Sequence, residues 1–355
     1  MPQKALLLTH ALTAPDAKFV VADIAVPEPG PGHVLIAVHA AALNPVDWIV
    51  AETGRYVSSW PTGLGMDAAG VVERLGEGVV KFGVGDRVMF AGTVAGPTIV
   101  TTFQQFVVMS VDFVAKVPSN ISLDQAATMP CTVATAAFGL YQAKQQPLGG
   151  LGLTPVWEEG GRGKYAGEPI VIIAGATGVG QHTIQFAKLS GFSPIITTAS
   201  PHNAAYLKSL GATHVLDRAL PLSALPARVR AITAKPVLYG YDAVSVPETQ
   251  NALFDAVAPG GQILLVKRTV AVDEAKVVER GTYVARVFGD VQAPGMQEIG
   301  RTLYAHFTQL VEAGEIKPTR LEVLPDGLAG IPDGLQRLKK GISALKFVAH
   351  PQETS

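Results

Sequence analysis

The first part of the chain, to about Pro118, alternates short apolar runs with turns rich in glycine and proline. The runs are typical of β-strands, and turns such as 27–32 and 76–78 separate them at short intervals. We therefore predict a compact, partly antiparallel β domain of barrel or sandwich type. The predicted strands are 4–9, 33–42, 70–75, 86–90 and 103–111.

From about Asp124 the pattern changes, because longer stretches with helical periodicity alternate with short apolar runs. Residues 124–146 form an alanine-rich stretch that predicts a long helix, interrupted by Pro130 near its start. Farther along, strands and helices alternate, which is the pattern of a doubly wound parallel sheet. The predicted strands are 169–175, 193–198, 214–216, 261–266 and 285–288, and the predicted helices are 179–190, 203–210 and 252–258.

Two segments depart from these patterns. Segment 147–169 holds seven glycines and three prolines, so we predict a long irregular loop that is functional or mobile and that shapes substrate specificity. The tail has a helix–strand pattern of its own, with a predicted helix at 301–312 and a predicted strand at 344–350, and it is a candidate to complete the first domain. On that basis we predict domains at 1–125, completed by 305–355, and at 126–304.

Composition narrows the class of protein. Apolar residues make up 48% of the 355 residues and charged residues 16%, which excludes a disordered chain. Lys and Arg total 28 against 29 Asp and Glu, so no basic surplus points to a nucleic-acid partner. Cys131 is the only cysteine, which excludes an intrachain disulfide. No apolar run has signal-peptide or membrane-spanning length, so we expect a cytoplasmic protein without a membrane partner.

The strongest local signal lies between Ile170 and Gln181, where an apolar run ends in a glycine-rich turn and a helical pattern follows at once. Glycines in such a turn let a pyrophosphate approach the backbone and the N–H groups of the helix N-terminus. A tight turn without any ligand is the alternative. The predicted dinucleotide-binding residues are Ala174, Gly175, Ala176, Thr177, Gly178, Val179 and Gly180.

The end of the next strand indicates which nicotinamide cofactor fits. Sites for NAD place an acidic residue there, about 20 residues after the glycine turn, to bind the ribose 2′-OH. Segment 195–203 has no carboxylate and offers Thr197, Thr198, Ser200, His202 and Asn203 instead. These donors suit a 2′-phosphate, so NADPH is favoured over NADH, with an ordinary polar turn as the alternative.

Several segments in combination resemble those of medium-chain dehydrogenases/reductases. The resemblance implies an α/β fold, with a GroES-like β-rich catalytic domain plus a Rossmann domain built on a doubly wound parallel sheet. The segments that carry it are 40–47 (AAALNPVD), 65–72 (GMDAAGVV), 84–88 (VGDRV), 174–180 (AGATGVG), 210–217 (LGATHVLD), 258–266 (APGGQILLV) and 310–317 (LVEAGEIK).

Zinc alcohol dehydrogenases of this superfamily have a Cys ligand where Asn44 stands and a Gly-His-Glu motif where residues 65–67 stand. Met66 replaces the His, and Asp67 alone cannot assemble a three-ligand site, so we expect no metal. The Asn-Pro-x-Asp pattern at 44–47 is similar to that of zinc-free quinone oxidoreductases and enoyl reductases. A finer resemblance, carried by 188–192, 200–203 and 148–167, is to fungal trans-acting enoyl reductases, such as the partner of the lovastatin synthase and toxin-cluster reductases.

The resemblance implies NADPH as the cofactor and further contacts outside the glycine turn. For Asn44 and Asp47, two roles are equally open: contact with the cofactor, and capping of a turn or of the following helix. Lys267 and Lys346 are alternatively solvated loop charges, and Asp67 is more often structural than catalytic. The implied cofactor-binding residues are Asn44, Asp47, Thr135, Ser200, His202, Asn203, Arg218, Val266, Lys267, Leu345 and Lys346.

The same resemblance implies hydride transfer to the β-carbon of an α,β-unsaturated carbonyl, followed by protonation of the α-carbon. The candidate catalytic residues are Thr135 and Tyr56. Backbone N–H groups near Thr135, or a cofactor ribose hydroxyl, would bind the developing enolate oxygen, while Tyr56, in a predicted lid, and water are equal candidates for the proton donor.

Two other functions stay open from the sequence, an NADPH:quinone oxidoreductase and a non-catalytic NADPH-binding protein. The partners we expect are a small-molecule enone, an enoyl thioester or a quinone, with an acyl carrier or a polyketide synthase as a further candidate. The oligomeric state is open between monomer and homodimer.

Overall fold

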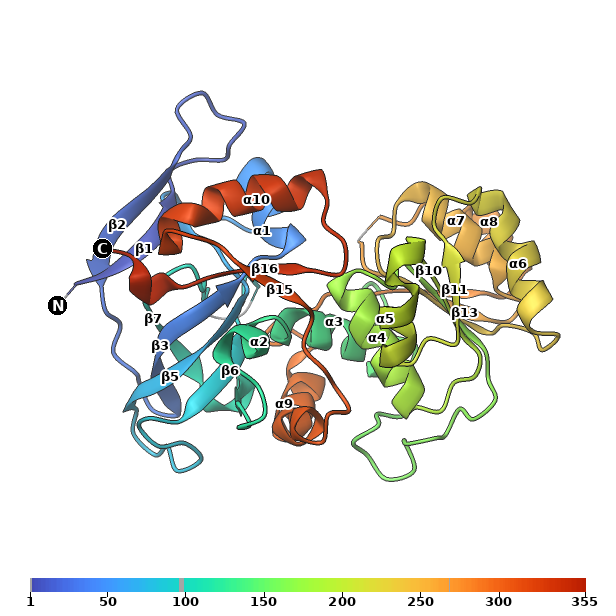
Figure 1. Ribbon diagram of the computed structural model, residues 1–355, viewed down its shortest axis with the longest axis horizontal. Helices are drawn as coiled ribbons and strands as arrows, with labels where there is room; N and C mark the ends of the chain where they lie inside the picture. The colour runs from blue at the N-terminus through green and yellow to red at the C-terminus, as the bar shows by residue number, and fades with distance from the viewer. Residues whose placement is uncertain (1, 96–98, 268) are drawn as a thin grey trace. The chain divides into compact units, whose positions relative to one another are not determined.

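The computed structural model describes residues 2–95, 99–267 and 269–355. The chain divides into two compact units (Figure 1). Unit 1 comprises Met1–Cys131, Asp290–Ala313 and Pro318–Ser355, and unit 2 comprises Thr132–Gly289 and Gly314–Lys317. Within the described residues, no helix has both the length and the apolar composition needed to cross a bilayer.

Unit 1 is built on two β-sheets. The smaller sheet has the order β2 (Phe19–Ala25), β1 (Pro2–Leu8) and β4 (Thr62–Gly63). The larger sheet has the order β15 (Leu321–Val323), β16 (Lys346–Ala349), β3 (His33–Ala42), β5 (Asp67–Leu75), β6 (Arg87–Ala91) and β8 (Val114–Lys116), and β7 (Phe106–Ser110) also pairs with β3. Since β16 pairs with β3 in antiparallel register, the end of the chain completes the sheet that its beginning forms.

Helices and short 3₁₀ turns complete unit 1. Helix α1 begins directly after β3 with Pro45, whose fixed φ suits the first turn of a helix, and it stops at Gly54, whose φ of 67° few other residues adopt. This places Asn44 and Asp47 where the sheet meets the helix. The helices are α1 (Pro45–Thr53), α2 (Leu123–Ala127), α9 (Gln297–Glu312) and α10 (Ile331–Lys340), and the 3₁₀ turns are η1 (Val111–Phe113), η4 (Gly327–Gly330) and η5 (Pro351–Glu353).

Unit 2 contains a six-stranded parallel sheet of order β11-β10-β9-β12-β13-β14. Numbered within the unit, this order is 3-2-1-4-5-6, which is the order of dinucleotide-binding sheets, and it confirms the predicted fold class. Helices α4 and α5 lie on one face of the sheet and α6, α7 and α8 on the other (Figure 1). The strands are β9 (Ile170–Ile173), β10 (Ile195–Ala199), β11 (His214–Asp217), β12 (Tyr239–Asp242), β13 (Gln262–Leu265) and β14 (Tyr283–Arg286).

The central strands of this sheet are apolar because they are buried on both faces. Val171, Ile196 and Ile263 belong to one core cluster and have no solvent-exposed surface. The predicted interruption of the 124–146 stretch is confirmed, since α2 ends before Pro130 and α3 begins there. The helices of unit 2 are α3 (Pro130–Tyr141, which begins in unit 1), α4 (Gly178–Leu189), α5 (Ala204–Leu210), α6 (Leu225–Ile232), α7 (Pro247–Ala256) and α8 (Glu274–Glu279), with the 3₁₀ turns η2 (Pro201–Asn203) and η3 (Leu222–Ala224).

The long segment 148–167 contains no helix or strand, as predicted. The ring of Tyr165 stacks on Phe192 with centroids 5.1 Å apart and packs edge-on against Tyr239, which begins β12. The second half of the segment therefore lies at the edge where the strands of the sheet start. The glycine turn follows the opposite ends of these strands. The role of segment 148–167 in substrate specificity stays a prediction.

One surface contact of unit 1 makes its stability depend on pH. The His350 ring lies between two carboxylates, with Nε2 2.9 Å from Asp124 Oδ1 and Nδ1 2.9 Å from Glu353 Oε1. Burial of the ring lowers the pKa of His350, but the two carboxylates outweigh this effect, and the net pKa is raised above its ordinary value. The folded state therefore binds a proton more tightly than the unfolded state does.

We expect His350→Gln to lower the stability of the protein by about 1 kcal/mol at pH 6 and by much less at pH 9. The stabilisation that His350 contributes is fully present below its pKa in the unfolded state, about 6.5, and it is lost as the pH rises through its raised pKa in the folded state. Thermal unfolding at both pH values measures it. His33→Gln is the control, because that ring faces the carbonyl of Pro31 at 2.8 Å and not a carboxylate; an equal pH dependence in both variants would contradict the assignment.

Candidate functional site

The glycine-rich turn follows β9 and opens α4. Thr177 caps the helix, because its Oγ1 accepts the N–H of Gly180 at 3.0 Å. The neighbouring strand fixes the other end of the turn, since Thr198 accepts the N–H of Gly175 at its carbonyl, at 3.0 Å, and that of Ala174 at its hydroxyl, at 2.9 Å. These bonds hold the turn in one conformation at the carboxyl end of β9.

Close packing inside unit 2 explains why this turn needs glycine. A Cβ on Gly175 would lie 2.1 Å from Oγ1 of Thr197, and a Cβ on Gly180 would lie 2.4 Å from the carbonyl oxygen of Ala174. The glycines alone therefore do not demonstrate a ligand, because the fold requires them in any case.

The backbone N–H groups at this helix end are the feature that suits a ligand. Those of Ala176, Gly178 and Val179 donate to no acceptor in the part of the chain that the structure describes. They belong to the first turn of a 12-residue helix, where unpaired N–H groups and the helix dipole favour an anion. The residues present therefore fit a dinucleotide pyrophosphate.

The polar residues predicted near the adenosine end lie together at the carboxyl ends of β10 and β11. The N–H of Arg218 donates to the carbonyl of Ala199 at 3.0 Å, which fixes Arg218 beside the residue that ends β10. Ser200 is half-buried, and the side chains of His202 and Arg218 are exposed. Asn203 is buried, so its amide is not presented on this surface.

Val266 and Lys267 follow β13 at the same edge of the sheet. The N–H of Val266 donates to Oγ of Ser245 at 2.9 Å, which joins the ends of β13 and β12, and Lys267 is exposed. The residues predicted to bind the dinucleotide thus lie together at one edge of the sheet. At this edge the strand order changes direction between β9 and β12, which is where such sheets bind their ligands.

Thr135 lies inside α3, so its own backbone N–H belongs to the helix. Its carbonyl accepts the Tyr241 hydroxyl at 2.9 Å, and its Oγ1 lies so close to Gly289 that a Cβ there would be 2.0 Å away. The side chain of Thr135 is half-buried. An enolate contact from backbone N–H groups near Thr135 stays a prediction.

Unit 1 holds a buried polar network that joins four elements. The Asp67 carboxylate, which is fully buried, accepts hydrogen bonds from Lys346 Nζ at 2.5 Å, from Asn44 Nδ2 at 2.9 Å and from the Cys131 N–H at 2.6 Å. Lys346 also donates to Asn44 Oδ1 at 2.9 Å. These residues start β5 and β16, follow β3 and open α3, so one carboxylate and one ammonium fix four chain segments together.

This network excludes one of the two predicted roles of Lys346, and it favours the structural role of Asp67 over a catalytic one. Lys346 is 5% exposed, so it is not the solvated loop charge that was one of its two alternatives. Its ammonium uses two of its three N–H donors within unit 1, while the neighbouring Leu345 is half-buried. The contacts of Asp67 favour a structural role. Burial raises the pKa of the Cys131 thiol far above its usual range, which disfavours the thiolate form.

Asp47 is a second buried carboxyl of this region and is 2% exposed. Its Oδ2 accepts the N–H of Asn44 at 2.6 Å, so the predicted helix-capping role is confirmed for Asp47. Desolvation raises the pKa of Asp47 to about 7, and the nearby Asp67 carboxylate adds to this effect, while Lys346 and the backbone N–H groups of Asn44 and Gly65 oppose it.

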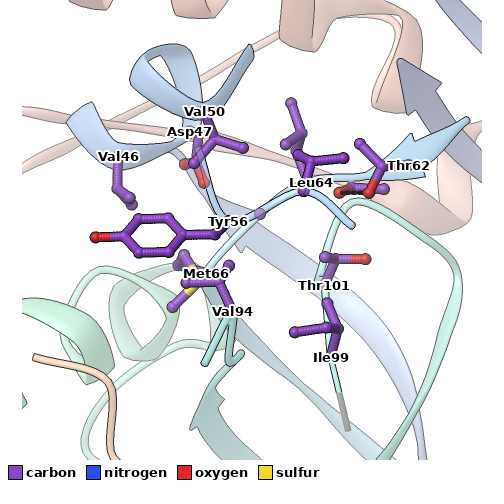
Figure 2. A pocket seen from close by; sticks show the side chains of 13 residues that line it. Val46, Asp47, Val50, Tyr56, Thr62, Leu64, Met66, Val94, Ile99 and Thr101 are labelled. Atoms are coloured by element: carbon purple, nitrogen blue, oxygen red, sulfur yellow. Dashed lines mark hydrogen bonds between the residues drawn. The ribbon is translucent and has the colours of Figure 1, made fainter. Parts of the chain in front are cut away.

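Asp47 also lines a pocket within unit 1 (Figure 2). Tyr56 lines the same pocket and has a φ of 68°, which is uncommon for a residue with a side chain. The structure thus brings Asp47 and Tyr56 to one cavity, although the sequence assigned them to different roles. The pocket is lined by Val46, Asp47, Val50, Tyr56, Val57, Thr62, Gly63, Leu64, Gly65, Met66, Val94, Ile99 and Thr101.

Several pocket residues had no signal in the sequence. Val94, Ile99 and Thr101 come from the segment after β6, whose composition resembles that of any surface turn. Met66 stood out only as the residue that replaces a zinc ligand. Among the residues that the structure describes, no group of three or more His, Cys, Asp or Glu side chains is arranged to hold a metal ion.

Comparison with known proteins identifies the family. The model described as alcohol dehydrogenase GroES-like domain matches residues 30–119, and the model described as zinc-binding dehydrogenase matches residues 178–283. The chain is 32% identical over 330 residues to the trans-enoyl reductase resD of Aspergillus sclerotiorum, covering 87% of this chain and 90% of the relative. It is 29% identical over 318 residues to the trans-enoyl reductase grgB of a Penicillium species, covering 85% of each chain.

A solved structure agrees in fold over the full length. It is described as a putative zinc-dependent alcohol dehydrogenase protein from Rhizobium etli, is 26% identical, and matches with a TM-score of 0.80 over 99% of this chain and 98% of the other. The chain therefore belongs to the medium-chain dehydrogenase/reductase superfamily, and it is an oxidoreductase related to the fungal trans-enoyl reductases.

Proposed function

We propose that this oxidoreductase transfers a hydride from NADPH to the β-carbon of an α,β-unsaturated carbonyl compound, without zinc. Two relatives that align with 85% or more of the chain are named trans-enoyl reductases, which supports this reaction. In this proposal unit 2 is the NADPH-binding domain, close to the predicted 126–304, and unit 1 is the catalytic domain, close to 1–125 with 305–355.

The observation that best supports a site without zinc is the buried ammonium group of Lys346. Zinc alcohol dehydrogenases of the superfamily have metal ligands where Asn44 and residues 65–67 stand. Here Asn44 and Asp67 hold the ammonium instead, at 2.9 and 2.5 Å. A positive charge is thus already paired with the one carboxylate left among those positions, and a divalent cation would have to displace it.

Unit 2 offers the groups that NADPH requires. NADPH supplies the hydride when it is bound. The free N–H groups of Ala176, Gly178 and Val179 would hold its pyrophosphate, and the exposed Arg218 and His202 would face its 2′-phosphate. Thr135, Val266 and Lys267 remain proposed contacts at the other end of the cofactor.

The lining of the unit 1 pocket suits the reacting end of a small, largely apolar substrate. The cavity measures about 20 Å³, which is room for about one water molecule, so we propose that only the reacting end of the substrate enters it. Seven of its lining residues are aliphatic or Met, and three carry hydroxyl groups. We propose a short enone or enoyl thioester as this substrate. An acyl carrier or a polyketide synthase would be the source of a thioester.

Turnover measurements distinguish an enoyl reductase from a quinone reductase. We expect the protein to consume NADPH with short enones and enoyl thioesters at a kcat/KM at least tenfold above that with any quinone of matched size. The decrease in NADPH absorbance measures both rates. A higher kcat/KM with quinones would assign the protein to the quinone reductases, and NADPH binding without turnover on either class would reject the proposed reaction.

Cofactor preference tests the 2′-phosphate contacts. We expect NADPH to raise Tm more than NADH at equal concentration, because stabilisation follows affinity for the folded state. Arg218→Ala should weaken NADPH binding by about tenfold and leave NADH binding nearly unchanged, since one charge-assisted contact to phosphate is lost. Arg228→Ala on α6 removes the same charge from another exposed position and should change neither affinity. Greater stabilisation by NADH would contradict the assignment.

The buried ion pair gives a further test of the zinc-free reading. Lys346→Met should destabilise the protein by about 3–5 kcal/mol, because it leaves the Asp67 carboxylate buried without a counterion. The double variant with Asp67→Asn should recover part of this loss. Thermal unfolding measures both. Lys339→Met is the matched control, since Lys339 is 44% exposed and pairs with Glu52 on the surface, where the cost is about 1 kcal/mol or less.

In the wild-type protein, we expect neither a chelator nor added Zn²⁺ to change the rate of NADPH consumption. Loss of activity on dialysis against a chelator, restored by Zn²⁺, would contradict the zinc-free proposal.

A further inference from the structure

The pocket of unit 1 contains one carboxyl group, that of Asp47, among the described residues that line it. The side chain reaches the pocket from α1, and Val50 of the same helix and Leu64 and Met66 lie around it (Figure 2). Burying a carboxyl beside aliphatic side chains destabilises its ionised form. An acid group in this position therefore needs an explanation beyond helix capping, which a solvent-exposed Asp performs equally well.

The contacts of Asp47 leave it able to hold and release a proton. Its Oδ2 accepts the Asn44 N–H, and the Gly65 N–H also bonds to the carboxyl, so both backbone groups stabilise the ionised form. Of the charged groups nearby, Asp67 on β5 favours protonation and Lys346 on β16 favours ionisation. The balance leaves its pKa at about 7, so both forms are populated at neutral pH.

We propose that the Asp47 carboxyl is the proton donor to the α-carbon of the substrate, an assignment that rests on the function proposed above. When the hydride supplied by NADPH has bonded to the β-carbon, the electrons of the double bond form an enolate. The O–H bond of Asp47 then breaks, its proton bonds to the α-carbon and the carbonyl group reforms. The resulting carboxylate is stabilised by its two N–H donors and regains a proton from water.

Tyr56 is the rival donor, because its ring lines the same pocket. The two assignments predict different stereochemistry after mutation. A donor fixed on one side of the substrate delivers its proton to one face of the enolate, whereas water does so with less control. The donor is therefore the residue whose loss makes the new α-carbon centre a mixture of configurations.

The experiment uses an α-methyl-substituted enoyl thioester, NADPH and the full-length protein. The wild-type protein should give one configuration at the α-carbon, with deuterium there when the solvent is D₂O. Asp47→Asn retains an oxygen that accepts the Asn44 N–H. We expect this variant to lose 10²- to 10⁴-fold in kcat, the range for removal of a general acid, and to give both configurations.

The pH profile gives an independent readout. Because the donor must be protonated, kcat of the wild-type protein should be constant at low pH and fall about tenfold per pH unit above pH 7. The profile of Asp47→Asn should be flat across this range. A purely structural role of Asp47 would lower Tm but would alter neither the stereochemistry nor the shape of the pH profile.

Two control variants complete the test. Asp86→Asn changes a carboxylate that likewise accepts the N–H three residues earlier, from Gly83 at 2.9 Å, but lies outside the pocket; it should retain the wild-type rate. Tyr56→Phe should retain a single configuration and the decline above pH 7. The proposal is overturned if folded, NADPH-binding Asp47→Asn keeps both properties, or if Tyr56→Phe loses them. If the wild-type protein turns over no enone or enoyl thioester, the proposed function fails instead.

Discussion

The structure of unit 1 depends on one buried ion pair. The Asp67 carboxylate and the Lys346 ammonium lie 2.5 Å apart and are buried, an arrangement that is stable only when hydrogen bonds satisfy the remaining donors and acceptors. Asn44 and the Cys131 N–H provide those bonds. The pair thereby fixes where β5 and β16 start and where α1 and α3 begin, and it sets the electrostatic environment of the adjoining pocket.

Sequence reasoning succeeded where chemistry and periodicity are local. The turn at 174–180 follows an apolar strand and precedes a helix, and both neighbours were recognisable from residues close by. The parallel sheet then gathers the ends of β9, β10 and β13 at one edge, so a prediction of the strands also groups the candidate cofactor residues. Strand β12 was missed because two of its four residues, Gly240 and Asp242, are of types that are depleted in strands, and no apolar run accompanies them.

The part that sequence reasoning did not reach depends on contacts between distant residues. Lys346 is 279 positions from Asp67, and no local pattern distinguishes a lysine that folds into a core from one on a loop. Burial of Asp47 is equally invisible in the motif at 44–47, since the same four residues could cap an exposed helix. The segment 148–167 was correctly predicted to be irregular, but its composition does not reveal which edge of the sheet its aromatic residues contact.

That segment gives unit 2 a spectroscopic label of its own. Of the three tryptophans in the chain, Trp48 and Trp60 belong to unit 1, whereas Trp157 belongs to unit 2, where its ring packs edge-on against Tyr141 with centroids 5.2 Å apart. Indole fluorescence is sensitive to such surroundings. A form of the protein that retains Trp157 alone would report the melting of the nucleotide-type sheet separately from that of the β-rich half.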